Sequence, residues 1–226
     1  MIKFYYTLGP NPMKVVLCLE EMGLAYEPIP IDLRGGEQHE DWYRAINPNG
    51  KVPAIVDGPT TVFDSNAILL YLADKTGLCL PEPDLRGDML SWLMFIASGV
   101  GPYSGQSAHF KAHAPPPQDY AIARYDFEAK RHWGIVDDRL ADRAFMVGDS
   151  FTIVDMAFWG WARVIPHLMG PKALGRLPHV ARHLEAINER PAGQRALAIK
   201  DRHAFKTGDY DAAERVAMFP HLATLT

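Results

Sequence analysis

The pattern of apolar and polar positions divides the chain into a first part of short strands alternating with helices and a second part of helices alone. The strand-like runs are 2–6, 26–32, 51–57 and 62–64. The helical patterns that alternate with them are 13–22, 41–46 and 65–76. The resulting order β-α-β-α-β-β-α predicts a thioredoxin-like sheet, in which Pro28 and Pro30 suit an edge strand.

A break in this pattern separates the two parts. Pro81 and Pro83 fall among charged residues in segment 81–87, a composition typical of a linker. Beyond it the strand pattern stops, and helical spacing occurs at 89–100, 120–140, 154–165 and 179–189. We therefore predict an α+β protein with a thioredoxin-like domain at 1–80 and an all-helical domain at 88–226.

Two helix starts carry recognisable capping residues. Ser65 precedes an apolar helix that Gly77 ends, and we expect its hydroxyl to cap that helix. Thr152 and Asp155 stand three residues apart ahead of another apolar helix, which predicts a capping box.

Composition and charge narrow the classes of partner. The chain has 226 residues, 48% of them hydrophobic, and its 27 acidic and 23 basic side chains give a formal net charge of −4. This balance offers no basic surface, so we expect no nucleic-acid partner. The N-terminus lacks the apolar core of a signal peptide, and no apolar run reaches about 18 residues. We therefore expect a soluble, cytoplasmic protein that does not bind a membrane.

The cysteines and histidines add little chemistry. Cys18 and Cys79 are too few for a disulfide framework. Cys18 lies inside a helical apolar pattern and is expected to be buried, whereas Cys79 lies in a proline-rich loop where we expect packing or solvent contact. His109 and His113 stand four residues apart but have no evident third ligand, so we expect no metal.

The turn between the first strand and the first helix is a candidate site for an anion or a thiolate. Unpaired backbone N–H groups point outward at a helix N-terminus and stabilise negative charge together with the helix dipole. A reactive cysteine often occupies such a turn. The residues here are Thr7, Leu8, Gly9, Pro10, Asn11 and Pro12. If this turn takes part in chemistry, the reactive group has to arrive with a ligand.

Other positions offer groups that match a peptide-like ligand. A cis Val52–Pro53 bond would turn the Val52 backbone outward to pair with an extended ligand, although a trans proline at a strand edge fits the sequence equally well. Ser65 at a helix start suits a carboxylate and Asp64 suits an ammonium group, although the same pair also serves as a plain helix cap.

Gln38 and Lys51 offer neutral and positive donors for a second carboxylate. Together these features favour an extended ligand that has a free amino-acid head, a second acid and its own reactive group. Glutathione has this chemistry, with a thiol in the middle.

Several ordered motifs carry a resemblance to a known family. YYTLGPNPMKVVLCLEEMGLAYE, INPNGKVPAIVD and DSNAILLYLADKTG resemble the glutathione-binding half of a glutathione transferase. WLMFIASGVGPYSGQSAHF, YAIARYDFEAKRHW and GDSFTIVDMAFWGW resemble the helical half of the bacterial nu class and its yeast prion-protein relatives. The likeness covers about residues 1–200. It implies a homodimer with a glutathione site in each subunit, glutathione as a substrate and no metal.

The resemblance also implies roles for individual residues. Val52 and cis-Pro53 would pair with the cysteinyl backbone of glutathione, and Asn11 would lie beside its sulfur. The γ-glutamyl head would meet Asp64 and Ser65. The remaining implied contacts are Gln38 and Lys51 for the glycyl end and Arg131 for the glutathione region.

One position departs from the nu-class pattern. That class usually has threonine-proline-asparagine in the turn, whereas this chain has Gly9-Pro10-Asn11 and lacks the hydroxyl at position 9. We therefore assign catalysis to Asn11 and the backbone N–H groups of the turn, with Thr7 as a substitute hydroxyl if the turn bends differently. Tyr5 and Tyr6 face opposite ways and are expected to be core residues.

The predicted function is activation of the glutathione thiol. A free thiol has a pKa of about 8.5, so the turn has to lower it by only one or two units to make the thiolate abundant at neutral pH. The thiolate would attack a small electrophile or reduce a disulfide. The alternatives are a non-catalytic glutathione-binding protein of the same fold and a glutathione-dependent isomerase or dehalogenase.

Two further segments have simpler interpretations. The glycine-rich segment 101–110 is expected to border the pocket for the electrophile, opposite the turn. Trp159 and Trp161 are expected to pack in the hydrophobic core.

Overall fold

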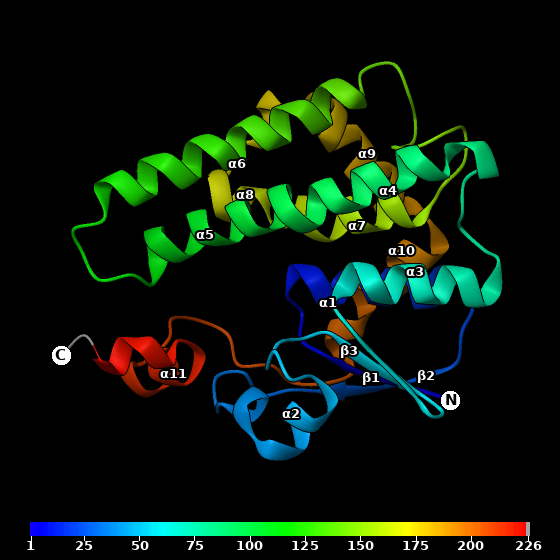
Figure 1. The fold of residues 1–226 in the computed structure, drawn as a ribbon. Coiled ribbons are helices and arrows are strands. Elements are labelled where there is room, and N and C mark those ends of the chain that lie inside the picture. The colour runs from blue at the N-terminus through cyan, green and yellow to red at the C-terminus, as the bar shows by residue number, and fades with distance from the viewer. Residues whose placement is uncertain (225–226) are drawn as a thin grey trace.

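The computed structural model describes residues 1–224, in which a four-stranded sheet is followed by a helical part (Figure 1). The strands are β1 Ile2–Tyr6, β2 Tyr26–Pro30, β3 Ala54–Asp57 and β4 Thr60–Phe63. The helices are α1 Pro10–Glu21, α2 Asp41–Ile46, α3 Ser65–Thr76, α4 Arg86–Phe95, α5 Gly101–Ala112, α6 Asp119–Arg139, α7 Ile153–Ala162, α8 Ile165–Met169, α9 Pro178–Glu189, α10 Pro191–Ala198 and α11 Ala212–Met218. The predicted order of elements in the first part is confirmed.

The sheet has the strand order β2-β1-β3-β4, with β1 parallel to β2 and antiparallel to β3. The proline-containing strand β2 lies at an edge, as predicted. Helices α1 and α3 cover the face of the sheet that looks toward the helical part, and α2 lies on the other side (Figure 1). This arrangement confirms the thioredoxin-like fold followed by an all-helical part.

Alternation along β1 sends its two tyrosines into different cores. Tyr6 is fully buried in the large core that includes α1 and α3. Tyr5 is buried in a smaller core on the opposite face, where it packs edge-to-face against Tyr43 of α2. Burial raises the phenol pKa of both residues. Both tyrosines are core residues, as predicted.

The large core continues from α1 into the helical part through α7. All ten residues of α7 are buried. A Cβ added at Gly160 would lie 2.5 Å from both the Pro10 carbonyl oxygen and the Lys14 Cγ. The absence of a side chain at this position therefore lets α7 reach the first turn of α1, and α7 is thereby brought against the turn that the sequence marks as a candidate site.

Two capping predictions have different outcomes. The capping box is confirmed, since the Thr152 hydroxyl accepts from Val154 N at 3.3 Å and the Asp155 carboxylate accepts from Thr152 N at 2.8 Å. The assignment of Ser65 as the cap of α3 is wrong. Asp64 is the N-cap, and its carboxylate accepts from the N–H groups of the second and third helical residues.

Some helices were not predicted from the sequence. Segment 101–112 forms α5, which continues α4 through a π-helical stretch at Ile96–Val100. Gly101 and Gly105 weaken its helical signal. Both lie against the Trp161 ring, and a Cβ at Gly101 would be crowded, at 3.0 Å from the Ile96 carbonyl oxygen and 3.2 Å from Trp161 Nε1. The helical part starts at Arg86, inside the predicted linker, and the division into domains at 1–80 and 88–226 stays a prediction.

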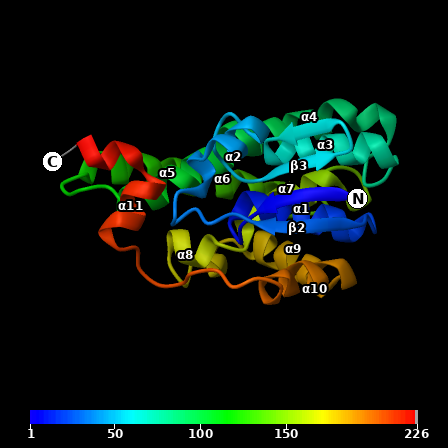
Figure 2. The same ribbon diagram turned by 90° about the horizontal axis from the view of Figure 1, so that it is seen from below.

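The C-terminal segment, residues 203–224, returns from α10 to the sheet and places α11 near α2 and the end of α5 (Figures 1 and 2). His203 starts this path, with its Nδ1 2.9 Å from the Tyr6 hydroxyl. Phe205 then packs edge-to-face on the Tyr6 ring. The segment therefore meets the thioredoxin-like part close to the turn that follows β1.

Candidate active site

The turn from β1 into α1 leaves very few backbone donors. Pro10 and Pro12 have no N–H, and the Gly9 N–H donates to the Thr7 hydroxyl at 3.3 Å. Met13 N–H is already inside the helix, because it donates to the Gly9 carbonyl at 3.2 Å. In the part of the chain that the structure describes, Asn11 N–H is the one donor of the first turn without a protein acceptor. Within the first turn of α1, the predicted contribution of backbone N–H groups is therefore reduced to that of Asn11.

The Asn11 side chain reaches across to the helical part. Its Oδ1 accepts a hydrogen bond from the Trp161 indole N–H at 2.9 Å. Trp161 is 8% exposed and belongs to the core, as predicted, but its polar edge also borders the site. Sequence reasoning missed this role because the two residues are 150 positions apart.

A cavity of about 200 Å³ lies over this turn. The predicted site residues Thr7, Asn11, Gln38, Lys51 and Val52 line it. Its further lining residues are Gly9, Pro10, Pro12, Leu33, Gly50, Trp161, Met218 and Phe219. The fold thus brings together the turn, the loop before β3, one residue of α7 and the C-terminal segment.

The loop before β3 is fixed in place by polar contacts. The Lys51 carbonyl accepts from the Tyr43 hydroxyl at 2.7 Å and from Asn47 Nδ2 at 2.5 Å, while the Lys51 side chain is exposed. The Val52–Pro53 peptide bond is cis, which settles the alternative left open by the sequence. Val52 lines the cavity and Pro53 is buried directly behind it.

In the side-chain amide of Gln38, the nitrogen is hydrogen-bonded and the oxygen, within residues 1–224, is not. Its Nε2 donates to the Leu33 carbonyl at 3.3 Å and to the Ala217 carbonyl at 3.1 Å. Its Oε1 is buried without a hydrogen-bond partner in the described residues. Gln38 therefore links the cavity wall to the C-terminal segment.

The start of α3 presents the predicted pair Asp64 and Ser65. Asp64 adopts a left-handed φ of 72°, and its carboxylate caps the helix through Asn66 N and Ala67 N. Ser65 is buried, and its hydroxyl oxygen accepts from the Lys14 ammonium at 3.2 Å. Neither residue lines the cavity over the turn; they are joined to α1 through Lys14.

Lys14 is a buried residue beside Ser65 that the sequence analysis did not single out. It is 1% exposed, and besides Ser65 it donates to Asn66 Oδ1 at 3.3 Å. Burial lowers the pKa of Lys14 to about 7, although the negative charge of Asp64 acts in the opposite direction. A lysine between Met13 and Val15, inside an otherwise apolar helical run, is the signal that would have found it.

Arg131 lies apart from this cluster. It is on α6, where its guanidinium pairs with Glu128 at 2.8 Å and lies 3.0 Å from His132 Nε2. It lines neither cavity described here. Its assignment to the glutathione region stays a prediction.

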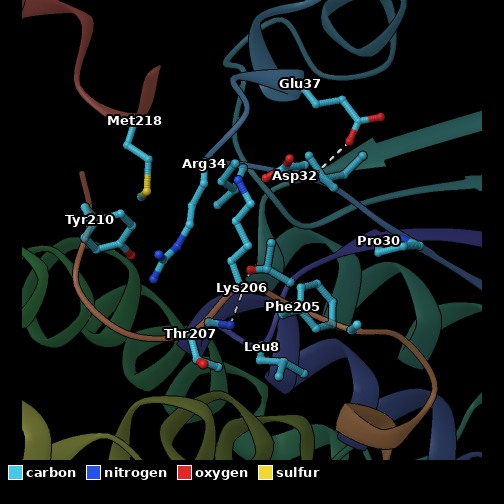
Figure 3. Close-up of a pocket in the computed structure, with 15 residues that line it drawn as sticks. Leu8, Pro30, Asp32, Arg34, Glu37, Phe205, Lys206, Thr207, Tyr210 and Met218 are labelled. Carbon is cyan, nitrogen blue, oxygen red and sulfur yellow. Dashed lines mark hydrogen bonds between the residues drawn. The ribbon is translucent and has the colours of Figure 1, made fainter. Parts of the chain in front are cut away.

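A second, larger cavity of about 700 Å³ adjoins the first (Figure 3). The two cavities share the residues Thr7, Gly9, Leu33 and Met218. The labelled residues of the larger cavity come from the turn after β1, from the end of β2 and the loop that follows it, and from the C-terminal segment (Figure 3). Arg34 and Lys206 lie next to each other there. A ligand too large for the smaller cavity has room to extend into this space.

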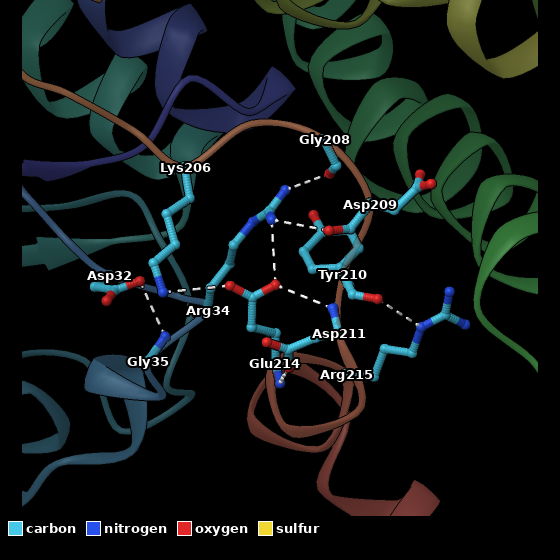
Figure 4. A network of polar contacts seen from close by, with 10 residues as sticks. All are labelled: Asp32, Arg34, Gly35, Lys206, Gly208, Asp209, Tyr210, Asp211, Glu214 and Arg215. Carbon is cyan, nitrogen blue, oxygen red and sulfur yellow. Dashed lines mark hydrogen bonds and ion pairs between the residues drawn. The ribbon is translucent and has the colours of Figure 1, made fainter.

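A polar network holds the C-terminal segment over the loop after β2 (Figure 4). Arg34 pairs with Glu214 at 3.2 Å and donates to the carbonyls of Gly208 at 2.7 Å and Asp209 at 3.3 Å. Lys206 joins Glu214 from the other side at 3.3 Å. These contacts position Met218 and Phe219 at the wall of the smaller cavity.

No cysteine lies at the turn. Cys18 is fully buried in the middle of α1, as predicted, and burial raises its pKa well above the ordinary value. Cys79 is partly buried, and burial raises its pKa to about 11. Neither protein thiol is therefore available as a nucleophile at neutral pH.

The fold defines the chain as a thioredoxin-like domain joined to a helical bundle, and comparison with known proteins gives the family. Residues 9–75 match the model of the glutathione S-transferase N-terminal domain, and residues 111–191 match that of the C-terminal domain. The disulfide-bond oxidoreductase YfcG of Escherichia coli is 39% identical, over 87% of this chain and 94% of the relative. The chain belongs to the glutathione S-transferase family.

Solved structures agree with this membership. A glutathione transferase from Pseudomonas putida has a TM-score of 0.82 and 35% identity over 88% of this chain and 91% of that chain, and it holds one glutathione disulfide per subunit. A glutathione transferase from Burkholderia graminis has a TM-score of 0.80 and 36% identity over 89% of each chain, and it holds two glutathione molecules per subunit.

Residues 1–224 contain neither a membrane-spanning helix nor a metal-binding cluster. No helix there is long and apolar enough to cross a membrane. No group of three or more histidine, cysteine, aspartate or glutamate side chains in that range is placed to hold a metal ion.

Proposed function

We propose that the protein is a glutathione transferase that lowers the thiol pKa of bound glutathione and uses the thiolate to reduce disulfides or to attack small electrophiles. The observation that carries the proposal is the convergence of Thr7, Asn11 and Val52 on one cavity at the start of α1. Because the chain's own thiols are buried or protonated, the sulfur nucleophile belongs to the ligand.

Two side chains stabilise the thiolate in this proposal. Asn11 donates from its amide. Thr7 replaces the hydroxyl that Gly9 lacks, since its Oγ1 is only 3.4 Å from the point where a Cβ at position 9 would be. Because Thr7 Oγ1 accepts from Gly9 N–H, its own O–H proton is free to donate to the sulfur.

The rest of glutathione lies between the loop before β3 and the start of α3. Val52, preceding Pro53, pairs with the cysteinyl backbone, and the γ-glutamyl carboxylate meets Ser65 at the start of α3. The contact between Lys14 and Ser65 Oγ supports this role, because an oxygen that accepts from the lysine keeps its proton for the ligand. Asp64 takes the ammonium group, Gln38 and Lys51 take the glycyl end, and Arg131 reaches the glutathione region.

Disulfide reduction then proceeds in two balanced exchanges. The glutathione thiolate attacks one sulfur of the substrate disulfide, a mixed disulfide forms, and the other sulfur leaves as a thiolate. A second glutathione thiolate breaks the mixed disulfide, which releases the second substrate thiolate and forms glutathione disulfide. The larger cavity beside the turn, and the pairs of glutathione units in the two relatives, support room for this second molecule.

We further propose that the chain forms a homodimer in the cytoplasm. The family resemblance supports the dimer, and a mass near twice 25.2 kDa in light scattering would test it. The two free cysteines are consistent with a reducing compartment. Fractionation of the producing cells tests the location.

The experiment that tests the function is turnover with glutathione of hydroxyethyl disulfide and of 1-chloro-2,4-dinitrobenzene. We expect the wild type to turn over at least one of them, Asn11→Ala to lose roughly 10- to 100-fold in kcat, and Thr7→Val to lose less. The exposed Thr61→Val is the matched control and should keep full activity. Glutathione binding without turnover of either substrate would instead identify a non-catalytic binding protein.

A further inference from the structure

The hydrogen bond between Trp161 and Asn11 determines which way the asparagine amide faces. An indole N–H only donates, so the atom it meets at 2.9 Å has to be an acceptor, the Asn11 Oδ1. The orientation of an asparagine amide is set by its hydrogen-bond partners. With the oxygen held by Trp161, the two N–H donors of Asn11 point away from the indole.

We propose that Trp161 is a positioning residue that holds the Asn11 amide with its NH2 group toward the sulfur of bound glutathione. The inference rests on the proposed function, in which Asn11 donates to the thiolate. The hydrogen bond from Trp161 explains why the Asn11 amide presents its NH2 group to the sulfur. The amide oxygen in that place would repel a thiolate.

The composition of the turn makes this orientation important. Pro10 and Pro12 contribute no N–H, and the Gly9 N–H is used by Thr7. The amide of Asn11 is therefore a large share of the donors that the turn offers to a thiolate. If this amide flipped, the turn would lose two N–H donors and gain a carbonyl dipole of the wrong sign.

The indole itself is held in one place. A Cβ at Gly101 would lie 3.2 Å from Trp161 Nε1, and one at Gly105 would lie 3.5 Å from the far edge of the ring. Both glycines belong to α5, which thus packs against the Trp161 ring while α7 carries it. The glycine-rich segment thus contributes to the packing that holds the indole in place.

Trp159 provides a matched comparison on the same helix. Its Nε1 donates to Asn188 Oδ1 at 2.8 Å, and Trp159 lines neither cavity. Both tryptophans of α7 therefore make the same kind of hydrogen bond to an asparagine, but only Trp161 makes it to a residue of the site.

The test compares Trp161→Phe with Trp159→Phe, since each change removes one indole N–H and keeps an aromatic ring. For each variant, kcat/KM for hydroxyethyl disulfide is measured against pH, and glutathione affinity is measured by calorimetry. We expect Trp161→Phe to raise the apparent thiol pKa by up to about one unit and to lower kcat/KM about threefold to tenfold at pH 7. The loss should disappear at high pH, with glutathione affinity nearly unchanged. Trp159→Phe should leave the profile unchanged.

A second variant covers the case in which Trp161→Phe does not fold. Asn11→Asp keeps an acceptor for the indole but places an anionic oxygen where the NH2 group was, so we expect a larger rise in thiol pKa than with Asn11→Ala. An Asp variant as active as Asn11→Ala or more active would overturn the proposed orientation.

The remaining outcomes separate this inference from the proposed function. If Asn11→Ala shifts the pH profile while Trp161→Phe does not, Trp161 does not position the amide. A weaker glutathione affinity with an unshifted profile in Trp161→Phe would assign Trp161 to ligand packing and would also overturn the inference. If Asn11→Ala itself leaves the profile unchanged, the proposed role of Asn11 fails first.

Discussion

The contact between α1 and α7 and the contact between the C-terminal segment and the loop after β2 border the same cavity, but they are built differently. The first is apolar and closely packed, with Gly160 against the backbone of Pro10. The second depends on Arg34, Glu214 and carbonyl groups, and none of the residues of α11 is buried. The contact between α1 and α7 therefore fixes the position of the turn after β1. The C-terminal segment covers the same cavity but is bound more weakly, through partly exposed polar contacts.

Gly160→Val should break the first contact and have the largest effect. Its side chain would overlap the Pro10 carbonyl and the Lys14 Cγ, so α7 has to move away from the turn. We expect a loss of about 3 kcal/mol in the free energy of unfolding and loss of glutathione turnover. Denaturant titration measures the change in the free energy of unfolding. Gly134→Ala in α6, where a Cβ meets nothing within 4 Å, is the control and should not destabilise.

Lys14→Met should change how the free energy of unfolding depends on pH, because Lys14 is buried in the same contact between α1 and α7. Lys14 has a pKa of about 7 in the folded protein and about 10.4 when unfolded, so the unfolded state binds more protons between these values. Wild-type stability should therefore rise relative to the variant by up to ~1.4 kcal/mol per pH unit above pH 7. Denaturant titrations from pH 6 to 9 measure the difference, and parallel curves would contradict it.

Glu214→Gln should weaken the second contact without affecting the first. The change removes the charge that faces Arg34 and Lys206, while glutamine still serves the capping box of α11. We expect docking of α11 to lose about 0.5–1 kcal/mol and global stability to stay the same. Amide exchange of α11 measures the docking. Asp142→Asn, in an exposed ion pair with Arg143, should leave it unchanged.

Acid should have the smallest effect, and again only on the second contact. His109 packs edge-to-face and His113 packs tilted against Phe219 of the C-terminal segment, and burial lowers the pKa of both imidazoles. The docked state thus binds protons less readily than the free state, so docking is complete above about pH 6.5 and weakens as the pH falls below it. Exchange of α11 amides, corrected for intrinsic rates, should accelerate at pH 5 while α7 amides stay protected.

The sequence predicts those features of the fold that neighbouring residues determine, and it does not predict those that depend on contacts between distant residues. Local periodicity gives the strand and helix order of the first part and the capping box at Thr152, because neighbours in the chain determine them. It misplaces the cap of α3, since Ser65 and Asp64 are both good caps and only the backbone geometry at Asp64 decides between them.

Some residues of the candidate site could likewise be predicted from local motifs, and others could not. Asn11, Lys51 and Val52 stand in recognisable local motifs and do line one cavity. Trp161 and Phe219 reach the site only through folding across 150 residues or more, and the contact of the α5 glycines with Trp161 also joins distant parts of the chain. No local pattern contains that information.

The low acidity of the chain's own thiols has a consequence for its durability. With a pKa of about 11 for Cys79, only about one sulfur in ten thousand is ionised at pH 7, and Cys18 has no access to solvent. We therefore expect a surplus of glutathione disulfide to leave both cysteines unmodified.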